Sequence, residues 1–177
     1  MSELNVPFDL MEWIEDHAAD FEPPVSNKVV WSDRDLVFMI VGGPNARNDF
    51  HIDPYDEIFM QLRGDIRVDL IDHDDIRHER RVAQGEVMLV PAETPHSPRR
   101  PAGSWGLVIE RPRPPGVLDE LAWFCDDCGL ELHRSSFHVS DIETELAAAI
   151  GRFNRDESLR TCKRCESLQA VPEDFVL

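Results

Sequence analysis

The apolar positions of the chain follow a helical spacing at both ends and a strand-like pattern in between. Near the start, one apolar face of a helix over residues 9–21 is formed by Leu10, Trp13, Ile14, Ala18 and Phe21. From about 29 to 115, short apolar or alternating runs stop at glycine and proline, which is typical of antiparallel strands. The expected strands cover residues 36–41, 58–62, 66–72, 86–90 and 107–109. This pattern predicts a mainly β sandwich or barrel.

The C-terminal third has a different pattern. Residues 111–116 read Arg-Pro-Arg-Pro-Pro-Gly, a composition typical of a boundary. We therefore expect two parts, a barrel with an N-terminal helix over residues 1–115 and a small C-terminal segment over residues 116–177. In that segment a helix is predicted by the spacing of Ile142, Leu146, Ile150 and Phe153. So short a segment has a marginal core of its own, and a bound metal would stabilise it.

Composition and charge narrow the classes of function. The chain has 177 residues, of which 42% are hydrophobic and 30% are charged, and its net charge is −17. An acidic chain is not expected to bind the phosphate backbone of a nucleic acid. The sequence has no apolar run long enough to span a bilayer, and its N-terminus lacks the pattern of a secretory signal. We expect a cytoplasmic protein with no membrane contact.

The four cysteines form two C-x-x-C pairs. Cys125 and Cys128 are the first pair, and Cys162 and Cys165 are the second. Two thiolates on one turn can bind one tetrahedral metal ion, and two such turns complete a set of four sulfur ligands. Zinc or a single iron fits this set. With no open position, such a site is structural by default, although electron transfer stays an alternative. Local disulfides are disfavoured in a cytosolic protein.

Histidines and one glutamate stand out in the strand-rich part. His51 and Glu57 lie in the segment 43–64, and the segment 85–91 leads to His96. These two blocks resemble the paired signature of the cupin superfamily, whose fold is a double-stranded β-helix, or jelly-roll. The resemblance implies that His51, Glu57 and His96 bind one metal ion. Asp53 stands where cupins usually have another histidine, and it could be a fourth ligand or a partner of the ligands; we expect it not to ligate.

Two histidines and one carboxylate are the ligand set of non-haem Fe(II) oxygenases. This set leaves positions on the metal open for substrate and dioxygen. Charged residues follow or precede these ligands in sequence: Arg47, Arg99, Arg100 and Glu110. In a small barrel, residues next to the ligand strands reach the cavity. Guanidinium groups with one further carboxylate suggest an anionic substrate that also has a proton to give.

The chain as a whole resembles the 3-hydroxyanthranilate 3,4-dioxygenase family in its bacterial form. The resemblance extends over nearly the whole length and rests on a combination of motifs. They are GGPNxRxDxH at Gly42–His51, Glu57, Val90-Pro91, His96-Ser97-Pro98, Arg100-Pro101, LVIERxRP at Leu107–Pro114, Trp123–Gly129 with its cysteine pair, and the closing Cys162-x-x-Cys165. The closing pair is typical of the bacterial form, which carries a rubredoxin-like metal site.

The resemblance implies a reaction and a role for each residue. The family inserts both atoms of O2 into 3-hydroxyanthranilate and opens its ring to 2-amino-3-carboxymuconate semialdehyde. That product cyclises to quinolinate, a precursor of NAD, and the same step serves the kynurenine pathway. By position, His51, Glu57 and His96 would hold Fe(II), and Arg47 would lie beside the dioxygen. Arg100, or else Arg99, would pair with the substrate carboxylate, and Glu110 would accept a hydrogen bond from the substrate hydroxyl or amino group. The family also suggests a homodimer.

Two other functions are compatible with the sequence. One is a cupin dioxygenase for another hydroxylated aromatic acid or a thiol. The other is a protein without catalytic activity, either a cupin that binds an anionic ligand or a zinc-ribbon regulator. The sequence leaves open whether Fe or Zn occupies the four-cysteine site and whether the reaction serves NAD synthesis or degradation.

Overall fold

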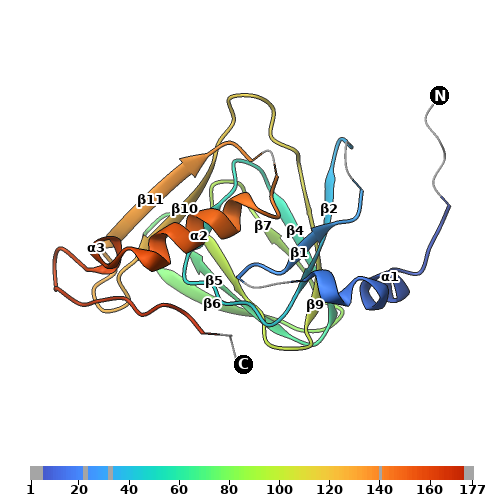
Figure 1. The fold of residues 1–177 in the computed structure, drawn as a ribbon, viewed down its shortest axis with the longest axis horizontal. Helices are drawn as coiled ribbons and strands as arrows, with labels where there is room; N and C mark the ends of the chain where they lie inside the picture. The colour runs from blue at the N-terminus through green and yellow to red at the C-terminus, as the bar shows by residue number, and fades with distance from the viewer. Residues whose placement is uncertain (1–5, 22–23, 32–33, 140, 174–177) are drawn as a thin grey trace.

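Short antiparallel strands make up most of the computed structural model, which describes residues 6–21, 24–31, 34–139 and 141–173 (Figure 1). The strands are β1 (Asn27–Val29), β2 (Val37–Gly42), β3 (Phe50–Ile52), β4 (Glu57–Arg63), β5 (Ile66–Ile71), β6 (Arg77–Val82), β7 (Val87–Val90), β8 (His96–Arg99), β9 (Trp105–Glu110), β10 (Asp119–Phe124) and β11 (Glu131–Phe137). The helices are α1 (Leu10–Asp16), a 3-10 turn at Ala18–Asp20, α2 (Glu145–Arg155) and α3 (Glu157–Arg160).

The strands form two facing sheets. One sheet has the order β1-β2-β9-β4-β7, and the other has the order β11-β10-β3-β8-β5-β6. The neighbouring strands in both sheets pair antiparallel. Two such sheets closing around a core form the jelly-roll barrel of the cupin type, so the expected fold class is confirmed. The described helices are too short or too polar to cross a bilayer.

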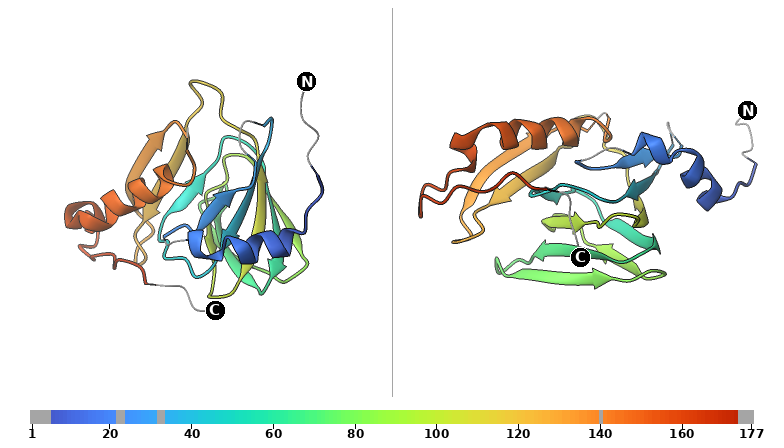
Figure 2. Two further views of the ribbon diagram at one scale, coloured as in Figure 1. Left: turned by 45° about the vertical axis from the view of Figure 1, so that its right-hand side comes forward. Right: turned by 60° about the horizontal axis from the view of Figure 1, so that its bottom comes forward.

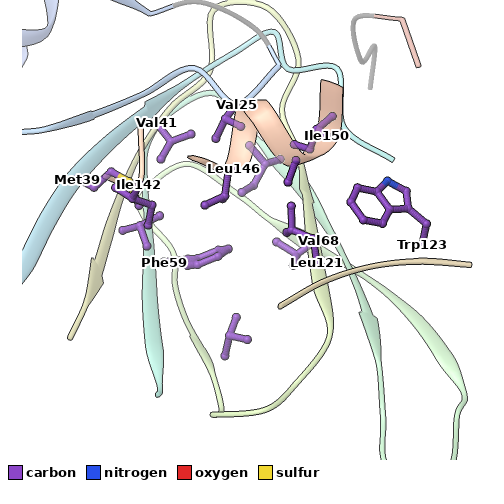
Figure 3. Close-up of a cluster of buried hydrophobic side chains, with 14 of the residues drawn as sticks. Val25, Met39, Val41, Phe59, Val68, Leu121, Trp123, Ile142, Leu146 and Ile150 are labelled. Atoms are coloured by element: carbon purple, nitrogen blue, oxygen red, sulfur yellow. The ribbon is translucent and has the colours of Figure 1, made fainter. Parts of the chain in front are cut away.

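Alternation along the strands separates the core from the outer faces. Met39 of β2 and Phe59 of β4 point into the barrel, where they pack in the main apolar cluster (Figure 3). Ile40 of β2 faces outward instead and is buried under Ile14 of α1. Helix α1 begins where the sequence predicts, because the Asp9 side chain accepts hydrogen bonds from the backbone N–H groups of residues 11 and 12. The N-terminal helix therefore covers the outside of the first sheet.

Helix α2 lies along β10 and β11 (Figure 2). Its Phe153 ring stacks on Trp123 of β10, with 4.4 Å between the ring centroids. The apolar spacing predicts a helix that includes Ile142, but α2 begins only at Glu145. The preceding Glu143 carboxylate instead accepts hydrogen bonds from Lys28 and from the Val29 backbone N–H. Ile142 is thereby held against the barrel core (Figure 3).

Strands that lack an apolar pattern are the main difference from the prediction. The five expected strands are present, with ends shifted by one or two residues. The sequence does not indicate β1, β3, β6, β8, β10 and β11. The charged stretch before Val82 contains β6, which pairs with β5 along its whole length. Strand β10 pairs with β3, so residues after the expected boundary extend the same sheet as the barrel strands.

Candidate metal centre and cavity

The three expected metal ligands meet inside the barrel. His51 lies in the middle of β3 and pairs directly with His96, the first residue of β8. Glu57 begins β4, and its Oε1 atom lies 3.0 Å from Nε2 of His96 and 3.4 Å from Nδ1 of His51. All three side chains are buried. These residues face the inside of the barrel from β3, β4 and β8, so two imidazoles and one carboxylate meet at one point.

Each imidazole is oriented by a hydrogen bond on its other nitrogen. His51 Nε2 lies 2.8 Å from Oδ2 of Asp119, and His96 Nδ1 lies 2.9 Å from the backbone oxygen of Thr94. These two oxygens can only accept, so the facing nitrogens donate to them. His51 Nδ1 and His96 Nε2 therefore face Glu57 and are the nitrogens left to bind a metal, as in protein metal sites; without a metal they share protons with the Glu57 carboxylate.

The charges around this point favour a cation. Burial raises the pKa of Glu57, but the neighbouring imidazoles outweigh that cost and hold its pKa well below the usual value. Burial lowers the pKa of His51, but Asp119 and Glu57 outweigh it and raise the pKa to about 10. Oε1 of Glu57 is buried without a hydrogen-bond partner. Two nitrogens and one carboxylate oxygen within 4.8 Å of one another fit Fe(II).

A cavity in the barrel core adjoins these three residues. Part of its lining is apolar, including Phe59, Ile142 and Leu146, which Figure 3 shows within the main apolar cluster. The rest is polar, and besides the metal ligands it includes Asn27, Arg47, Arg100 and Glu110. A small apolar cavity with a few converging polar groups is typical of a site for a small molecule.

Arg100 lies in this cavity without a charge partner. It is 1% exposed, and Nη1 donates to the side-chain oxygen of Gln61 at 3.3 Å. Its Nε has no hydrogen-bond partner, and none of the described carboxylates forms an ion pair with it. Burial, and then the charge of Arg47, lower the pKa of Arg100 to about 9. Arg99 does not line the cavity, because it turns to the other side and pairs with Asp69 at 3.1 Å.

Arg47 is held by a neighbour in sequence. Its Nη2 and Nε atoms donate to the two oxygens of Asp49, at 2.5 and 3.1 Å. Asp49 is fully buried, and although burial raises its pKa, the two-point contact with Arg47 lowers it overall. A guanidinium fixed by two parallel bonds has little freedom to rotate. Arg47 therefore presents its remaining N–H groups to the cavity from a fixed position.

Glu110 ends β9 with one oxygen bound and the other free. Oε1 accepts a hydrogen bond from Arg113 at 2.8 Å, while Oε2 is buried without a partner. Burial, and then the charge of Glu57, raise the pKa of Glu110 to about 8. The free oxygen of this carboxyl group can accept or hold a proton at the cavity wall.

The structure adds residues that the sequence reasoning did not assign. Asp119 and the Thr94 carbonyl orient the two imidazoles, Asp49 and Gln61 contact the two cavity arginines, and Arg113 contacts Glu110. Arg113 lies within the motif LVIERxRP, which was the one available signal for it. Asp53, which was expected not to ligate, accepts a hydrogen bond from Arg113 at 2.6 Å. Asp49 lies in the motif GGPNxRxDxH, two residues after Arg47, and Thr94 lies two residues before His96. The contacts of Asp119 and Gln61 join residues distant in sequence and leave no local pattern.

The four cysteines of the C-terminal segment come together in space. Sγ of Cys125 lies 3.6 Å from Sγ of Cys165, and the other two sulfur atoms are 3.5 Å apart. Each pair sits on a turn closed by a backbone hydrogen bond, from Gly129 to Cys125 and from Glu166 to Cys162. Four thiols within 4.8 Å of one another fit one tetrahedral metal ion.

Comparisons with known proteins agree with this geometry. Residues 1–154 match the profile of the family described as 3-hydroxyanthranilic acid dioxygenase. The chain is 44% identical to a 3-hydroxyanthranilate 3,4-dioxygenase of Bacillus thuringiensis over 98% of its own length and 96% of the relative. It is 40% identical to the enzyme of that name from Neurospora crassa, over 92% of this chain and 89% of the relative. A solved cupin-2 domain protein from Shewanella frigidimarina is 19% identical, with a TM-score of 0.45 over 55% of this chain and 91% of that one.

Proposed function

The chain belongs to the 3-hydroxyanthranilate 3,4-dioxygenase family, and we propose that it catalyses the reaction for which its relatives are named. That reaction joins 3-hydroxyanthranilate with both atoms of O2 and opens the ring to 2-amino-3-carboxymuconate semialdehyde. The proposal assigns each polar group of the cavity to one part of the substrate.

His51, Glu57 and His96 would hold Fe(II). Their donor atoms are preset by Asp119 and Thr94, so little reorganisation is needed on binding. When bound, ferrous iron acidifies the substrate hydroxyl and supplies the electron transfer to dioxygen that spin-paired protein groups cannot provide. The two-histidine, one-carboxylate set leaves positions open for both reactants.

The unpaired Arg100 guanidinium is the observation that carries the choice of substrate. A buried cation without a counter-ion lowers the stability of the protein, and a carboxylate that enters the cavity would offset this loss. The guanidinium fork binds a carboxylate at two points, which fixes the direction of the ring. Arg100 would thus orient the aromatic acid so that its hydroxyl and amino groups face the three ligands.

Glu110 and Arg47 would serve the reacting groups. The free oxygen of Glu110 would accept the hydrogen bond, and then the proton, of the substrate hydroxyl or amino group. Its pKa near 8 suits a group that takes up a proton and returns it near neutral pH. Arg47, fixed by Asp49, would stabilise the negative charge that develops on the attacking oxygen.

We further propose Fe or Zn at the four-cysteine site, a homodimer, and the cytoplasm as the compartment. All four cysteines are free thiols, which supports a reducing environment. A homodimer is supported by an apolar patch on the outer face of two adjacent strands, formed by Ile58, Met60, Val87 and Leu89. Strand β7 is also the edge of its sheet, where a second copy can approach.

The direct test is oxygen uptake by the Fe(II)-loaded protein. The protein is loaded anaerobically, the iron content is measured, and O2 consumption is followed after adding 3-hydroxyanthranilate. We expect one O2 per substrate consumed, and much slower turnover of gentisate, homogentisate and cysteine. Faster turnover of one of these three would indicate another cupin dioxygenase. Substrate binding without O2 uptake by fully loaded protein would indicate a protein that only binds the anion.

A further inference from the structure

One guanidinium holds three buried carboxylates beside the metal centre. Arg113 donates from Nη1 to Glu110 at 2.8 Å and from Nη2 to Asp53 at 2.6 Å. It also donates from Nε and Nη2 to the two oxygens of Asp119, at 2.7 and 2.5 Å. The fifth N–H donates to the backbone oxygen of Arg111 at 2.6 Å. An arginine has five such donors, so Arg113 is fully used by the protein itself.

These carboxylates lie close enough to compete for a metal ion. Asp53, Glu57 and Glu110 each offer an oxygen atom, and these atoms lie within 4.8 Å of one another. Glu57 belongs to this group and to the group formed with the two histidines. Divalent cations readily take additional carboxylate oxygens when these are within reach. An ion bound at Glu57 therefore has two further acidic side chains at hand, and their coordination would fill the positions that substrate and dioxygen need.

Arg113 differs in how completely it engages the two acids that could join Glu57. It binds Oδ2 of Asp53, whose Oδ1 already accepts from the Tyr55 backbone N–H at 2.7 Å. It binds Oε1 of Glu110 and leaves Oε2 for the cavity. Through Asp119 Oδ2, the same guanidinium also supports the acceptor that orients His51. One cation is therefore in contact with three of the buried acids near the ligands, Asp53, Glu110 and Asp119.

We propose that Arg113 is a positioning residue that keeps Asp53 off the metal, so that Asp53 does not fill a position that substrate and dioxygen need. The inference rests on the proposed function, because it concerns the metal that the proposed reaction uses. It adds a separate property, the number of carboxylates that the metal binds.

The test is a double-mutant cycle on metal affinity. Asp53→Asn is made in the wild-type chain and in Arg113→Gln, and the Kd of Mn(II) is measured by electron paramagnetic resonance of the free ion. Mn(II) is chosen because nitrogen and oxygen donors suit it better than thiolates do, which leaves the four-cysteine site silent. In the wild-type chain, we expect Asp53→Asn to change the Kd less than about twofold, because Asp53 does not touch the metal. In Arg113→Gln, the freed Asp53 becomes a ligand, and removing it should raise the Kd about tenfold.

Equal effects of Asp53→Asn in the two backgrounds would overturn the proposal. So would a tenfold loss of affinity caused by Asp53→Asn in the wild-type chain. Arg111→Gln is the matched control, because Arg111 is exposed, stacks over Tyr55 at 4.6 Å and should leave the Kd unchanged. If Arg113→Gln does not fold, Arg113→Lys replaces it, since one ammonium cannot reach three carboxylates. The Kd measurement uses no turnover, so absence of oxygen uptake would refute the proposed function and leave this cycle interpretable.

Discussion

At the scale of the residue, the cavity keeps a buried positive charge that the rest of the protein does not neutralise. Arg100 and Arg99 are adjacent in sequence, yet the guanidinium of Arg100 has only the neutral Gln61 as a hydrogen-bond partner, whereas Arg99 pairs with Asp69. Burying an unpaired charge lowers the stability of the fold. Such a cost is typical of functional sites, where a ligand supplies the missing partner.

Replacing Arg100 should therefore weaken substrate binding while stabilising the protein. In Arg100→Met, we expect KM for 3-hydroxyanthranilate to rise on the order of 100-fold, because a buried charge pair of this kind is worth about 2–5 kcal/mol. The free energy of unfolding should rise by about 1 kcal/mol or more, since the buried charge is gone. Steady-state oxygen uptake and chemical denaturation measure the two effects. Arg99→Met is the control, with KM near the wild-type value, and an equal rise of KM in both variants would contradict the assignment.

Arg47 should act on turnover instead of binding. In Arg47→Gln, the amide still reaches Asp49, but the positive charge beside the reacting oxygen is lost. We expect kcat to fall by about 10²-fold, as for the loss of one donor to a developing negative charge, with a smaller change in KM. Steady-state kinetics at saturating oxygen separates the two parameters. A rise of KM with unchanged kcat would show that Arg47 binds substrate.

At the scale of the element, the two cysteine turns have the same shape but different sequences. The residue after each pair, Gly129 and Glu166, has a positive φ, of 74° and 62° respectively. Glycine adopts this conformation without strain, whereas a residue with a side chain does so at a cost. The second turn therefore carries strain that the first avoids.

Glu166→Gly should stabilise the protein. We expect the free energy of unfolding to rise by about 0.5–1 kcal/mol, because the strain at positive φ is removed. Denaturation of the metal-loaded protein measures the change. Glu157→Gly is the matched control, because the same replacement in the first turn of α3 should destabilise by about 1 kcal/mol. A lower free energy of unfolding in Glu166→Gly would show that contacts of the glutamate side chain stabilise the protein by more than the backbone strain destabilises it.

The four-cysteine site should support the fold and not the reaction. Cys125→Ser removes one of the four sulfur ligands, so the metal content of this site and the melting temperature should both fall. The fraction that is folded and iron-loaded at the histidines should keep kcat within about threefold of wild type, since the sites use separate ligands. Metal analysis, thermal unfolding and oxygen uptake give the three readings. A folded, iron-loaded variant without activity would refute a structural role.

How far the sequence predicts these elements depends on what stabilises each one. Strands with an apolar pattern, such as Val37–Gly42, can be recognised in the sequence because burial of their apolar side chains stabilises them. Phe50–Ile52 is buried on every residue and is three residues long, so it has no readable period. Arg77–Val82 is mostly charged and becomes a strand by pairing with β5. The proposed metal ligands are predicted by the resemblance of their motifs to cupins, and they lie together in the structure. The contacts of Asp119 with His51 and of Arg113 with Asp53 join residues that only the folded chain brings together.

At the scale of the whole molecule, an acidic chain exposes one uncharged patch. On β4 and β7, Ile58 pairs with Leu89 and Met60 pairs with Val87, and these four side chains are 38–62% exposed. With a net charge of −17, two copies repel each other over most of their surface. Contact through the patch would bring apolar area together and favour association of two copies.

If the proposed homodimer forms through this patch, a charge placed in the patch should separate it. In Leu89→Glu, we expect the molar mass in solution to fall from that of a dimer to that of a monomer, measured by sedimentation equilibrium. Ile76→Glu provides the control, because Ile76 is similarly exposed, at 54% against 56%, but lies in the turn before β6. A dimer that persists in Leu89→Glu would place the contact elsewhere.

Strand β3, which carries His51, lies between β8 and β10, and Asp119 at the start of β10 is the hydrogen-bond partner of that histidine. During synthesis on the ribosome, residues 1–110 can emerge with all three proposed metal ligands present while β3 still lacks its second neighbour. Asp119 can orient the His51 imidazole only after residues 119–124 have left the exit tunnel, so we expect metal binding to follow synthesis of most of the polypeptide.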